Sequence, residues 1–302
     1  MPATAVALVL VSAVLHAGWN AYSKQSGPSA ARFFVIAVFG ALLVVPIVVV
    51  YREHVLQLPR TAIYGLIATG FCQAVYFVGL AGAYRHGHIS VAYPIARAVP
   101  IIAIALLVAG FGAGDAFTKI AILGIGCVIV GCFLVPMHHL RDLRLSHYTN
   151  RSVSFALLAA AGTTGYTVID DAVLRSLKEG PDWDLGDTRT AFLYLTLETW
   201  STLLWLAPVA VSSRVRRAET RAIFATQKRA AAVTAVMVYL SYGLVLASYT
   251  LAANVGYIAA FRQAAIPIGA AMGIVWFREP ITAPKTIGLI VLTSGLVLVA
   301  AY

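Results

Sequence analysis

The ionisable side chains that stand within long apolar stretches are the residues of this sequence that could do chemistry. Arg97 lies near the middle of one such stretch, Glu198 near the middle of another, and Arg262 several residues into a third. A charged side chain at the centre of a bilayer costs roughly 2.5–3.5 kcal/mol on insertion scales, so by default it marks a functional site. Guanidinium groups form paired hydrogen bonds to carboxylates and phosphates. The two arginines therefore predict an anion-binding site, with structural ion pairs between helices as the alternative.

Two side chains in these stretches can change their charge during a transport or reaction cycle, whereas arginine stays protonated. Glu198 is the stronger candidate for carrying a proton, because burial favours the neutral form of a carboxyl group. It could equally neutralise one of the arginines permanently. His16 is the second candidate, with a hydrogen-bonded structural role as the alternative. Asp170 and Asp171 are expected at the end of their helix, where a role in a lid or at the membrane interface competes with proton coupling.

Helical spacing adds polar and aromatic neighbours to these residues. Side chains three or four positions apart share one face of a helix, as is the case for His16 and Asn20, Tyr93 and Arg97, and Gln73 and Tyr76. Aromatic cavity walls are predicted from four further side chains, with packing or interfacial anchoring as the alternative: Tyr239, Tyr242, Tyr249 and Trp200. The predicted substrate-binding side chains are Arg97, Arg262, Tyr93, His16, Asn20, Trp19, Gln73, Tyr76 and Tyr242.

The composition of the chain indicates an integral membrane protein. Of its 302 residues, 60% are hydrophobic and 11% are charged, and the mean hydropathy is +0.85, whereas about a quarter of the residues of a typical soluble domain are charged. The formal net charge of +10 is explained by loops that face the cytoplasm and anionic headgroups, so no nucleic-acid partner is expected. The cysteines lie in apolar stretches without a CxxC pair, and no metal site, cofactor or catalytic group is predicted.

Stretches of about 20 apolar residues, the length that crosses a bilayer as a helix, occur ten times along the chain. They are residues 3–23, 30–51, 61–84, 88–111, 117–137, 152–173, 188–212, 230–252, 255–277 and 284–302. Barrel strands are excluded, because the runs are too long and do not alternate with a period of two. The first stretch lacks a preceding basic segment and is expected to be a helix of the protein, not a cleaved signal. The expected fold is an all-α membrane protein with ten transmembrane helices.

The charges in the short loops predict the orientation of the chain. Of the 22 lysines and arginines, 14 lie in the loops on one side of the ten helices and 6 on the other side, and the remaining two are Arg97 and Arg262. The more basic side is expected in the cytoplasm, which places both termini in the periplasm. The predicted protein is a multi-pass protein of the cell membrane, which in a bacterium is the inner membrane.

The chain contains an internal repeat at an offset of 164 residues. Residues 115–118 (Asp-Ala-Phe-Thr) fall on residues 279–282 (Glu-Pro-Ile-Thr), Gly124 falls on Gly288, and Gly131 falls on Gly295. The predicted repeats are residues 1–137 and 152–302, with five helices each. An odd number of helices inverts the second copy in the membrane, an architecture that recurs in transporters. The glycines predict close packing of helices within each half, with a homodimer contact as the competing use.

These features resemble the EamA-type branch of the drug/metabolite transporter (DMT) superfamily. The resemblance rests on the ten spans, the inverted five-plus-five repeat and three motifs: residues 16–20 (His-Ala-Gly-Trp-Asn), residues 166–170 (Tyr-Thr-Val-Ile-Asp), and residues 277–282 (Phe-Arg-Glu-Pro-Ile-Thr) followed by Gly288 and Gly295. Asp115 stands where the family usually has glutamate. The resemblance covers the whole chain and implies a ten-helix transporter without naming its substrate. Many relatives are thought to have cytoplasmic termini, contrary to the distribution of loop charges in this chain.

The predicted function is secondary transport of a small anionic or zwitterionic metabolite, such as an amino acid or an organic acid, by alternating access. The chain has no phosphate-binding GxxxxGK[ST] loop, no HExxH and no GxSxG, so it is not expected to be an enzyme. A flippase for lipid-linked substrates on the same fold is the closest alternative. An intramembrane enzyme and a channel are more remote ones. The expected partners are a small-molecule substrate and the lipid bilayer.

Overall fold

The computed structural model of the protein describes residues 1–23, 29–86, 89–110, 118–137, 139, 150–181, 183–252, 254–278 and 280–301. Nearly all of these residues are helical, and none of them belongs to a strand. The predicted all-α class is therefore confirmed for the described part of the chain.

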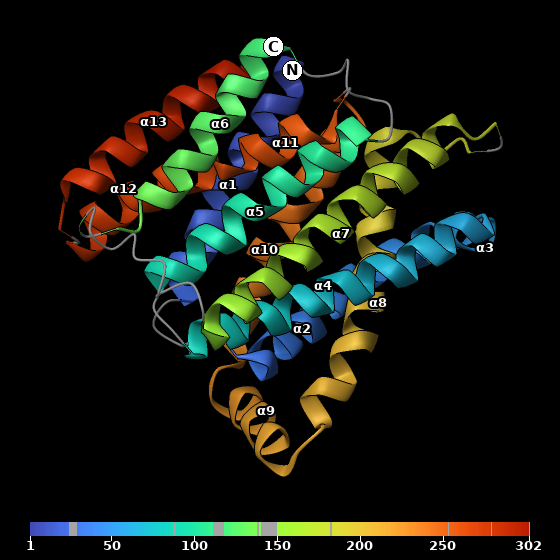
Figure 1. Cartoon of the computed structure of the whole chain (residues 1–302). Helices are drawn as coiled ribbons and strands as arrows, with labels where there is room; N and C mark the ends of the chain where they lie inside the picture. Colours follow the sequence, from blue (N-terminus) through green and yellow to red (C-terminus); the bar gives the residue numbers. More distant parts are fainter. Residues whose placement is uncertain are drawn as a thin grey trace.

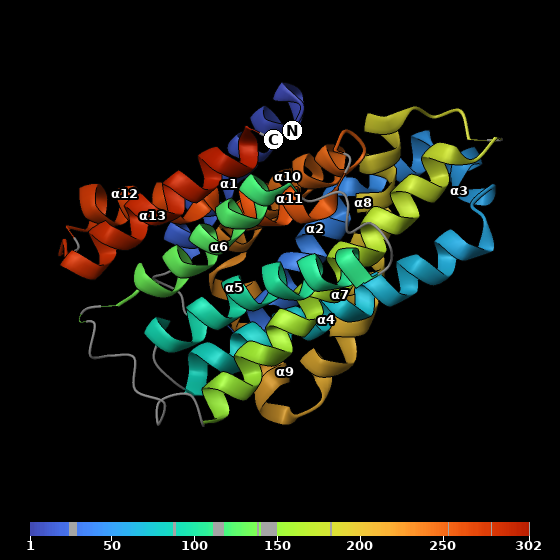
Figure 2. The same ribbon diagram turned by 45° about the horizontal axis from the view of Figure 1, so that its top comes forward.

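The helices follow the apolar segments of the sequence (Figures 1 and 2). In chain order they are α1 (Ala3–Ser23), α2 (Ala30–Val50), α3 (Arg52–Leu56), α4 (Arg60–His86), α5 (Ile89–Val108), α6 (Lys119–Leu134), α7 (Arg151–Glu179), α8 (Asp187–Val211), α9 (Arg214–Thr226), α10 (Lys228–Tyr249), α11 (Val255–Phe261), α12 (Ala265–Phe277) and α13 (Ala283–Ala300). The 3₁₀ turn η6 (Arg262–Ala264) connects α11 directly to α12.

Six helical segments of the described chain are long and apolar enough to cross a membrane: α2, α4, α7, α10, the continuous segment Val255–Trp276, and α13. Shorter apolar helices lie within α1, α5 and α6, at Ala3–Trp19, Ile95–Val108 and Lys119–Leu134. α8 contains Glu198 and several threonines in its interior, which lower its hydropathy. The six segments indicate an α-helical membrane protein.

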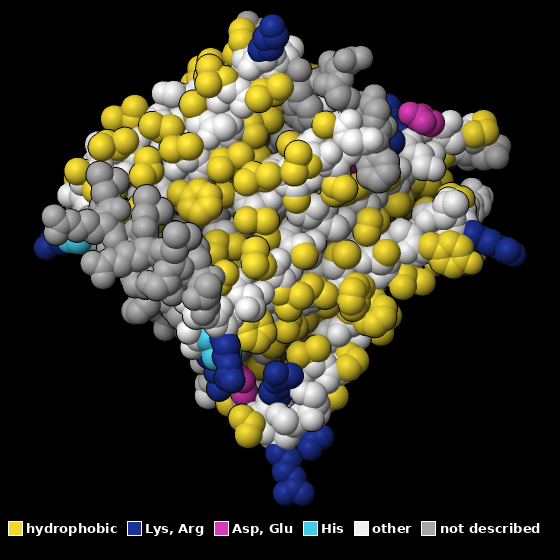
Figure 3. All heavy atoms as spheres, in the orientation of Figure 1, with side chains coloured by type: hydrophobic (Ala, Val, Ile, Leu, Met, Phe, Trp, Pro, Cys, Tyr) yellow, Lys and Arg dark blue, Asp and Glu magenta, His cyan; other side chains and the backbone are white. Residues whose placement is uncertain are grey.

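Apolar side chains cover the outside of the helix bundle. Leu204 and Val275 each expose 71% of their area, and Leu106 exposes 68%. In Figure 3 such side chains spread over the middle of the visible face, while lysine and arginine side chains stand at its corners. An extended apolar surface of this kind marks contact with a membrane or a partner, and its position along the long helices fits contact with lipid.

The two termini lie side by side at one end of the bundle, and α9 lies at the opposite end (Figures 1 and 2). α8 runs toward α9 and α10 runs back from it, so α9 connects the ends of two long helices. The cavity described below is lined by residues of α1, α4, α5, α7, α8, α10, α11 and η6.

Glycines of α6 and α13 pack directly against each other. A Cβ atom on Gly295 would lie 2.6 Å from the carbonyl oxygen of Gly124, and one on Gly131 would lie 2.8 Å from that of Gly288. The two backbones approach too closely for side chains, which is the usual reason for glycine at a helix contact in a membrane. The expectation of packing within each half is wrong, because α6 of the first half contacts α13 of the second. All four glycines are buried within one chain, which leaves their faces unavailable for a homodimer contact.

The Gly295→Ala variant is expected to destabilise the fold by about 1–3 kcal/mol, the usual cost of adding a methyl group to a tightly packed contact. Gly126 of α6 provides a matched control, because nothing lies within 4 Å of a Cβ atom at that position. Gly126→Ala is expected to be neutral or slightly stabilising, since alanine favours the helix. Thermal unfolding of the two variants in the same detergent measures the difference. Equal midpoints would contradict a contact of this closeness.

Candidate functional site

A cavity of about 90 Å³ lies inside the bundle. Eight side chains that the sequence predicts as functional line it: Arg97, Arg262, His16, Trp19, Gln73, Tyr76, Tyr242 and Glu198. The structure thus brings together residues that lie far apart in the sequence, and their binding of a substrate stays a prediction. The side chains of Asn20 and Tyr93, also predicted, lie outside the described residues.

Arg262 lies where a long helix changes its winding. Arg262 and Gln263 belong to the 3₁₀ turn η6, and 3₁₀ turns inside a long helix often accompany a functional hinge. Pro267 explains the position of the change, because it has no N–H to donate to the carbonyl oxygen of Gln263 one helical turn earlier. Both Arg262 and Gln263 line the cavity, so the altered winding occurs at the cavity wall.

Tyrosines surround the guanidinium group of Arg262. Its Nη1 lies 3.4 Å from the Tyr249 hydroxyl, and its Nη2 lies 3.5 Å from the Tyr166 hydroxyl. Its Cζ lies 5.6 Å from the centroid of the Tyr242 ring and 6.0 Å from that of Tyr166, within reach of cation–π attraction. In the described part of the chain, no carboxylate oxygen lies within 4.0 Å of this guanidinium. The interpretation of Arg262 as half of a structural ion pair is therefore wrong for this conformation.

Arg97 of α5 contacts His16 of α1. Its Nη2 donates to Nε2 of His16 at 2.7 Å. The indole Nε1 of Trp19 lies 3.3 Å from Nδ1 of His16, and the two rings meet edge to face with centroids 5.1 Å apart. Both ring nitrogens of His16 thus face N–H donors, and the lone pair that accepts from arginine is not available for a proton. Proton coupling through His16 therefore requires that its contact with Arg97 break first.

One threonine side chain lies between two buried carboxyl groups. Thr69 of α4 donates to Oδ1 of Asp170 in α7 at 2.6 Å, and its Oγ1 lies 3.3 Å from Oε1 of Glu198 in α8. Tyr194 also donates to Oδ1 of Asp170, at 2.8 Å, and Tyr242 donates to the other oxygen. Hydrogen bonds to an ionised acceptor are stronger than those to a neutral one, so three hydroxyl donors fit an ionised Asp170.

Glu198 has a different environment from that of Asp170. Its side chain is 1% exposed, and its Oε1 accepts a hydrogen bond from Gln73. Oε2 has no hydrogen-bond partner within the described residues, and a buried polar atom without a partner is costly. No ion pair within 4.0 Å joins Glu198 to Arg97 or Arg262, so permanent neutralisation through such a pair is absent here. Because Glu198 lines the cavity, a proton or a donor group of a ligand there would satisfy it.

Asp170 lies deep within α7, where the sequence predicted the end of a helix. The expected segment 152–173 continues as a helix to Glu179, because the following turns place apolar side chains on the buried face: Val173, Leu174 and Leu177. Asp170 is fully buried, so the predicted lid or interfacial position is wrong for it. Asp171 instead forms an ion pair with Arg175, one turn later, at 3.0 Å.

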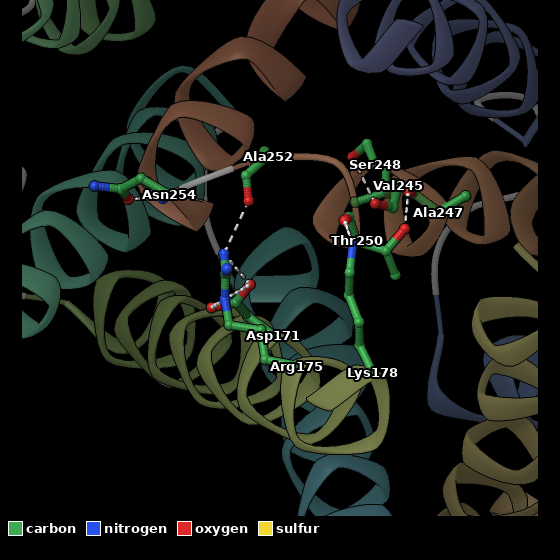
Figure 4. Close-up of polar contacts among 10 residues, drawn as sticks. Asp171, Arg175, Lys178, Val245, Ala247, Ser248, Thr250, Ala252 and Asn254 are labelled. Carbon is green, nitrogen blue, oxygen red and sulfur yellow. Dashed lines mark hydrogen bonds and ion pairs between the residues drawn. The ribbon is translucent and has the colours of Figure 1, made fainter. Parts of the chain in front are cut away.

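Two cations near the end of α7 hold the connection between α10 and α11. Arg175 donates to the carbonyl oxygen of Ala252 at 3.0 Å, and Lys178 donates to that of Thr250 at 2.9 Å (Figure 4). Lys178 also forms an ion pair with Asp187 at the start of α8, at 2.7 Å. These contacts join α7, α8 and the residues that follow α10, so they fix the relative positions of three elements.

Several residues of the site could not be recognised from the sequence. Thr69 and Tyr194 contact the carboxyl groups, and Tyr166 contacts Arg262, yet single hydroxyl side chains are common in apolar helices and indicate no ligand. Of the predicted aromatic walls, Tyr239 lines the cavity and Tyr249 lies against Arg262. Trp200 exposes 40% of its area on the outside of the bundle and does not line the cavity, so its prediction is wrong.

The sequence matches no known protein family and no curated protein. A solved structure titled "Crystal structure of protein" matches the fold with a TM-score of 0.66, over 100% of this chain and 99% of that one, at 12% identity. At this identity the likeness concerns the fold alone, because unrelated functions share folds. Fold and cavity together define an α-helical membrane protein with an internal cavity into which a few charged side chains project.

Proposed function

We propose that the protein is a secondary transporter that moves a small anionic or zwitterionic metabolite across the cell membrane by alternating access. The observation that carries the proposal is the position of Arg262. Its guanidinium lies at a cavity inside the bundle, among tyrosines, with no carboxylate within 4.0 Å in the described residues. The buried acids Asp170 and Glu198 act on this guanidinium only at longer range, Asp170 with the Tyr242 side chain between them. An anionic group that enters the cavity can contact the guanidinium directly, which no carboxylate of the described residues does.

The other charged groups around the cavity support the same class of substrate. Arg97 and Arg262 both offer donors for carboxylate or phosphate oxygens. Glu198 offers an acceptor at Oε2, which suits an ammonium group in a zwitterion or a coupling proton. The rings of Tyr76 and Tyr166 lie at the cavity wall with centroids 6.0 Å apart, and such faces suit the apolar part of a small metabolite.

The helix contacts support ten spans arranged as two inverted repeats of five helices. In that arrangement α1 corresponds to α7, α4 to α10, and α5 to the α11–α12 segment. If the two halves are exchanged, the contact between α1 and α10 corresponds to the contact between α7 and α4. In the same way, the contact between α1 and α12 corresponds to the contact between α7 and α5. All four contacts occur. The α2–α8 and α6–α13 contacts map onto themselves. In transporters of this architecture, one half moves against the other around a site at the repeat interface.

Alternating access also requires a contact that closes one end of the cavity and opens later in the cycle. Arg175 and Lys178 of α7 are suited to this, because they bind backbone carbonyls of the α10–α11 connection. Such bonds are few and lie at the ends of elements, so their loss leaves the helices intact.

A ligand screen followed by a transport assay tests the proposed function. Thermal-shift measurements of the purified protein against amino acids, organic acids and phosphorylated metabolites identify the ligand class. Proteoliposomes preloaded with a stabilising ligand are expected to take up the labelled ligand by counterflow. A flippase for lipid-linked substrates gives no counterflow of a water-soluble compound. Absence of counterflow for every stabilising ligand would contradict the transporter proposal.

Both termini are expected in the periplasm. The more basic set of loops includes α9, and the termini lie at the end of the bundle opposite to it (Figure 1). A C-terminal alkaline phosphatase fusion is expected to be active and a C-terminal fluorescent-protein fusion dark, and fusions placed after Gln227 should give the opposite pattern. The reverse outcome would mean that something other than loop charge sets the orientation.

A further inference from the structure

α9 is a short helix with one inward face and one basic face. Ile223 is buried, and the ring of Phe224 packs beside that of Phe39 with centroids 6.0 Å apart. Arg214, Arg217 and Arg221 follow one another at spacings of three and four residues and are all exposed, so they share the other face. Cations at such spacings repel each other and destabilise a helix. An anionic partner would turn this repulsion into attraction.

The neighbouring helices place α9 at the boundary of the apolar surface. The outward apolar side chains of α8 end at Val211, which is 52% exposed, just before α9 begins. Those of α10 begin at Val233, which is 47% exposed, shortly after α9 ends. The 13 residues of α9 span about 20 Å as a helix, too little to cross a hydrocarbon core of about 30 Å. α9 therefore lies at the boundary of the apolar surface, which for a protein in a bilayer corresponds to the region of the lipid headgroups.

The cations of this segment outnumber the acids that could neutralise them. α9 and the first two residues of α10 contain six lysines and arginines, and Glu219 is the only acid among them. Arg216 and Arg217 donate to carbonyl oxygens at the end of α8, each at 3.3 Å. The side chains of the other four form no hydrogen bond and no ion pair with any described residue. These four are Arg214, Arg221, Lys228 and Arg229. In Figure 3 lysine and arginine side chains gather at the corner of the molecule where Figure 1 shows α9.

We propose that α9 and the start of α10 form a binding site for the phosphate headgroups of anionic phospholipids in the adjacent leaflet. A basic helix that lies in the membrane plane binds lipid by its apolar face and by attraction to anionic headgroups. Here Ile223 and Phe224 pack on the protein, so the exposed cations and the exposed Val215 face the lipid. Phosphate oxygens at headgroup depth supply the countercharge that the chain lacks. This proposal does not depend on the transport function.

Competition between lipids in nanodiscs tests the site. The association of spin-labelled phosphatidylglycerol with the full-length protein is compared with that of spin-labelled phosphatidylcholine. The ratio of the two association constants is expected to be about fivefold or more for the unmodified protein, which corresponds to about 1 kcal/mol for a single basic residue at the membrane surface. Replacing Arg214, Arg221 and Arg229 by glutamine is expected to bring the ratio close to one.

The matched control replaces Arg52, Arg60 and Arg189 by glutamine. These three arginines are also exposed and lie at or near the starts of α3, α4 and α8, and Figure 1 shows α3 at the right of the molecule, away from α9, so their loss is expected to leave the ratio unchanged. Raising the salt from about 0.1 M to about 1 M shortens the Debye length from roughly 10 Å to 3 Å, so the unmodified protein should also lose its preference there. An equal fall in the control, an unchanged ratio in the α9 variant, or a preference that survives high salt would each overturn the proposal. A ratio near one in the unmodified protein would also overturn it and point to an acidic macromolecule as the partner.

Discussion

Proteoliposomes that contain the Glu198→Gln variant are expected to keep the exchange of substrate and to lose the accumulation driven by a pH gradient. Glutamine has the shape of the protonated carboxyl group but cannot release a proton. Its amide oxygen can replace Oε1, which accepts from Gln73 and lies near Thr69, so the cavity wall keeps these contacts. The variant therefore separates binding from coupling.

Glu219→Gln is the matched control for this variant, because Glu219 lies on α9 and does not line the cavity. Its exchange and its pH-driven uptake are expected to equal those of the unmodified protein. If Glu198→Gln loses both activities, Glu198 belongs to direct binding or to the structure. Unchanged pH-driven uptake would remove Glu198 from the coupling mechanism and leave His16, freed from Arg97, as the next candidate.

Replacing Arg262 by lysine is expected to weaken substrate binding at least tenfold, which corresponds to about 1.4 kcal/mol. Lysine keeps the positive charge but loses the planar fork that binds two oxygens at once and stacks on aromatic rings. In this structure Nη1 and Nη2 of the fork face the hydroxyls of two different tyrosines, Tyr249 and Tyr166, and the compact ammonium group of lysine does not reproduce this spread of donors. Titration of the purified protein with its ligand, by calorimetry or thermal shift, measures the loss.

Arg189→Lys at the exposed start of α8 is the control for the arginine variant and is expected to bind normally. The midpoint of thermal unfolding without ligand separates the two roles of Arg262. If Arg262 binds the substrate, Arg262→Lys should bind the ligand weakly and unfold at the normal midpoint. If Arg262 is purely structural, the variant should unfold at a lower midpoint and bind the ligand with normal affinity. The same comparison applies to Arg97→Lys, which also removes the guanidinium nitrogen that contacts His16. Normal affinity in both variants would refute the anion site.

Many of the cavity-lining residues could be predicted because a charged side chain is unfavourable in lipid. Arg97, Arg262 and Glu198 had to turn away from the hydrocarbon, and helical spacing then placed Gln73 and Tyr76 on one face of α4. All five line one cavity. Trp200 shows the limit of this reasoning, because an aromatic ring is stable against lipid as well as in a polar cavity, and its 40% exposure followed from packing alone.

The sequence by itself determined that the chain is helical and apolar and which side chains avoid lipid, because these properties depend on composition and on the period of the helix. Only the tertiary structure decided which helices meet. The glycines of α6 pack on α13 in the other half, and Thr69 joins Asp170 to Glu198 across 101 and 129 residues of sequence. The period of the sequence shows which face of a helix carries polar or small residues. It does not show which other helix packs against that face. That choice depends on how closely two distant backbones can approach and on which donors meet which acceptors.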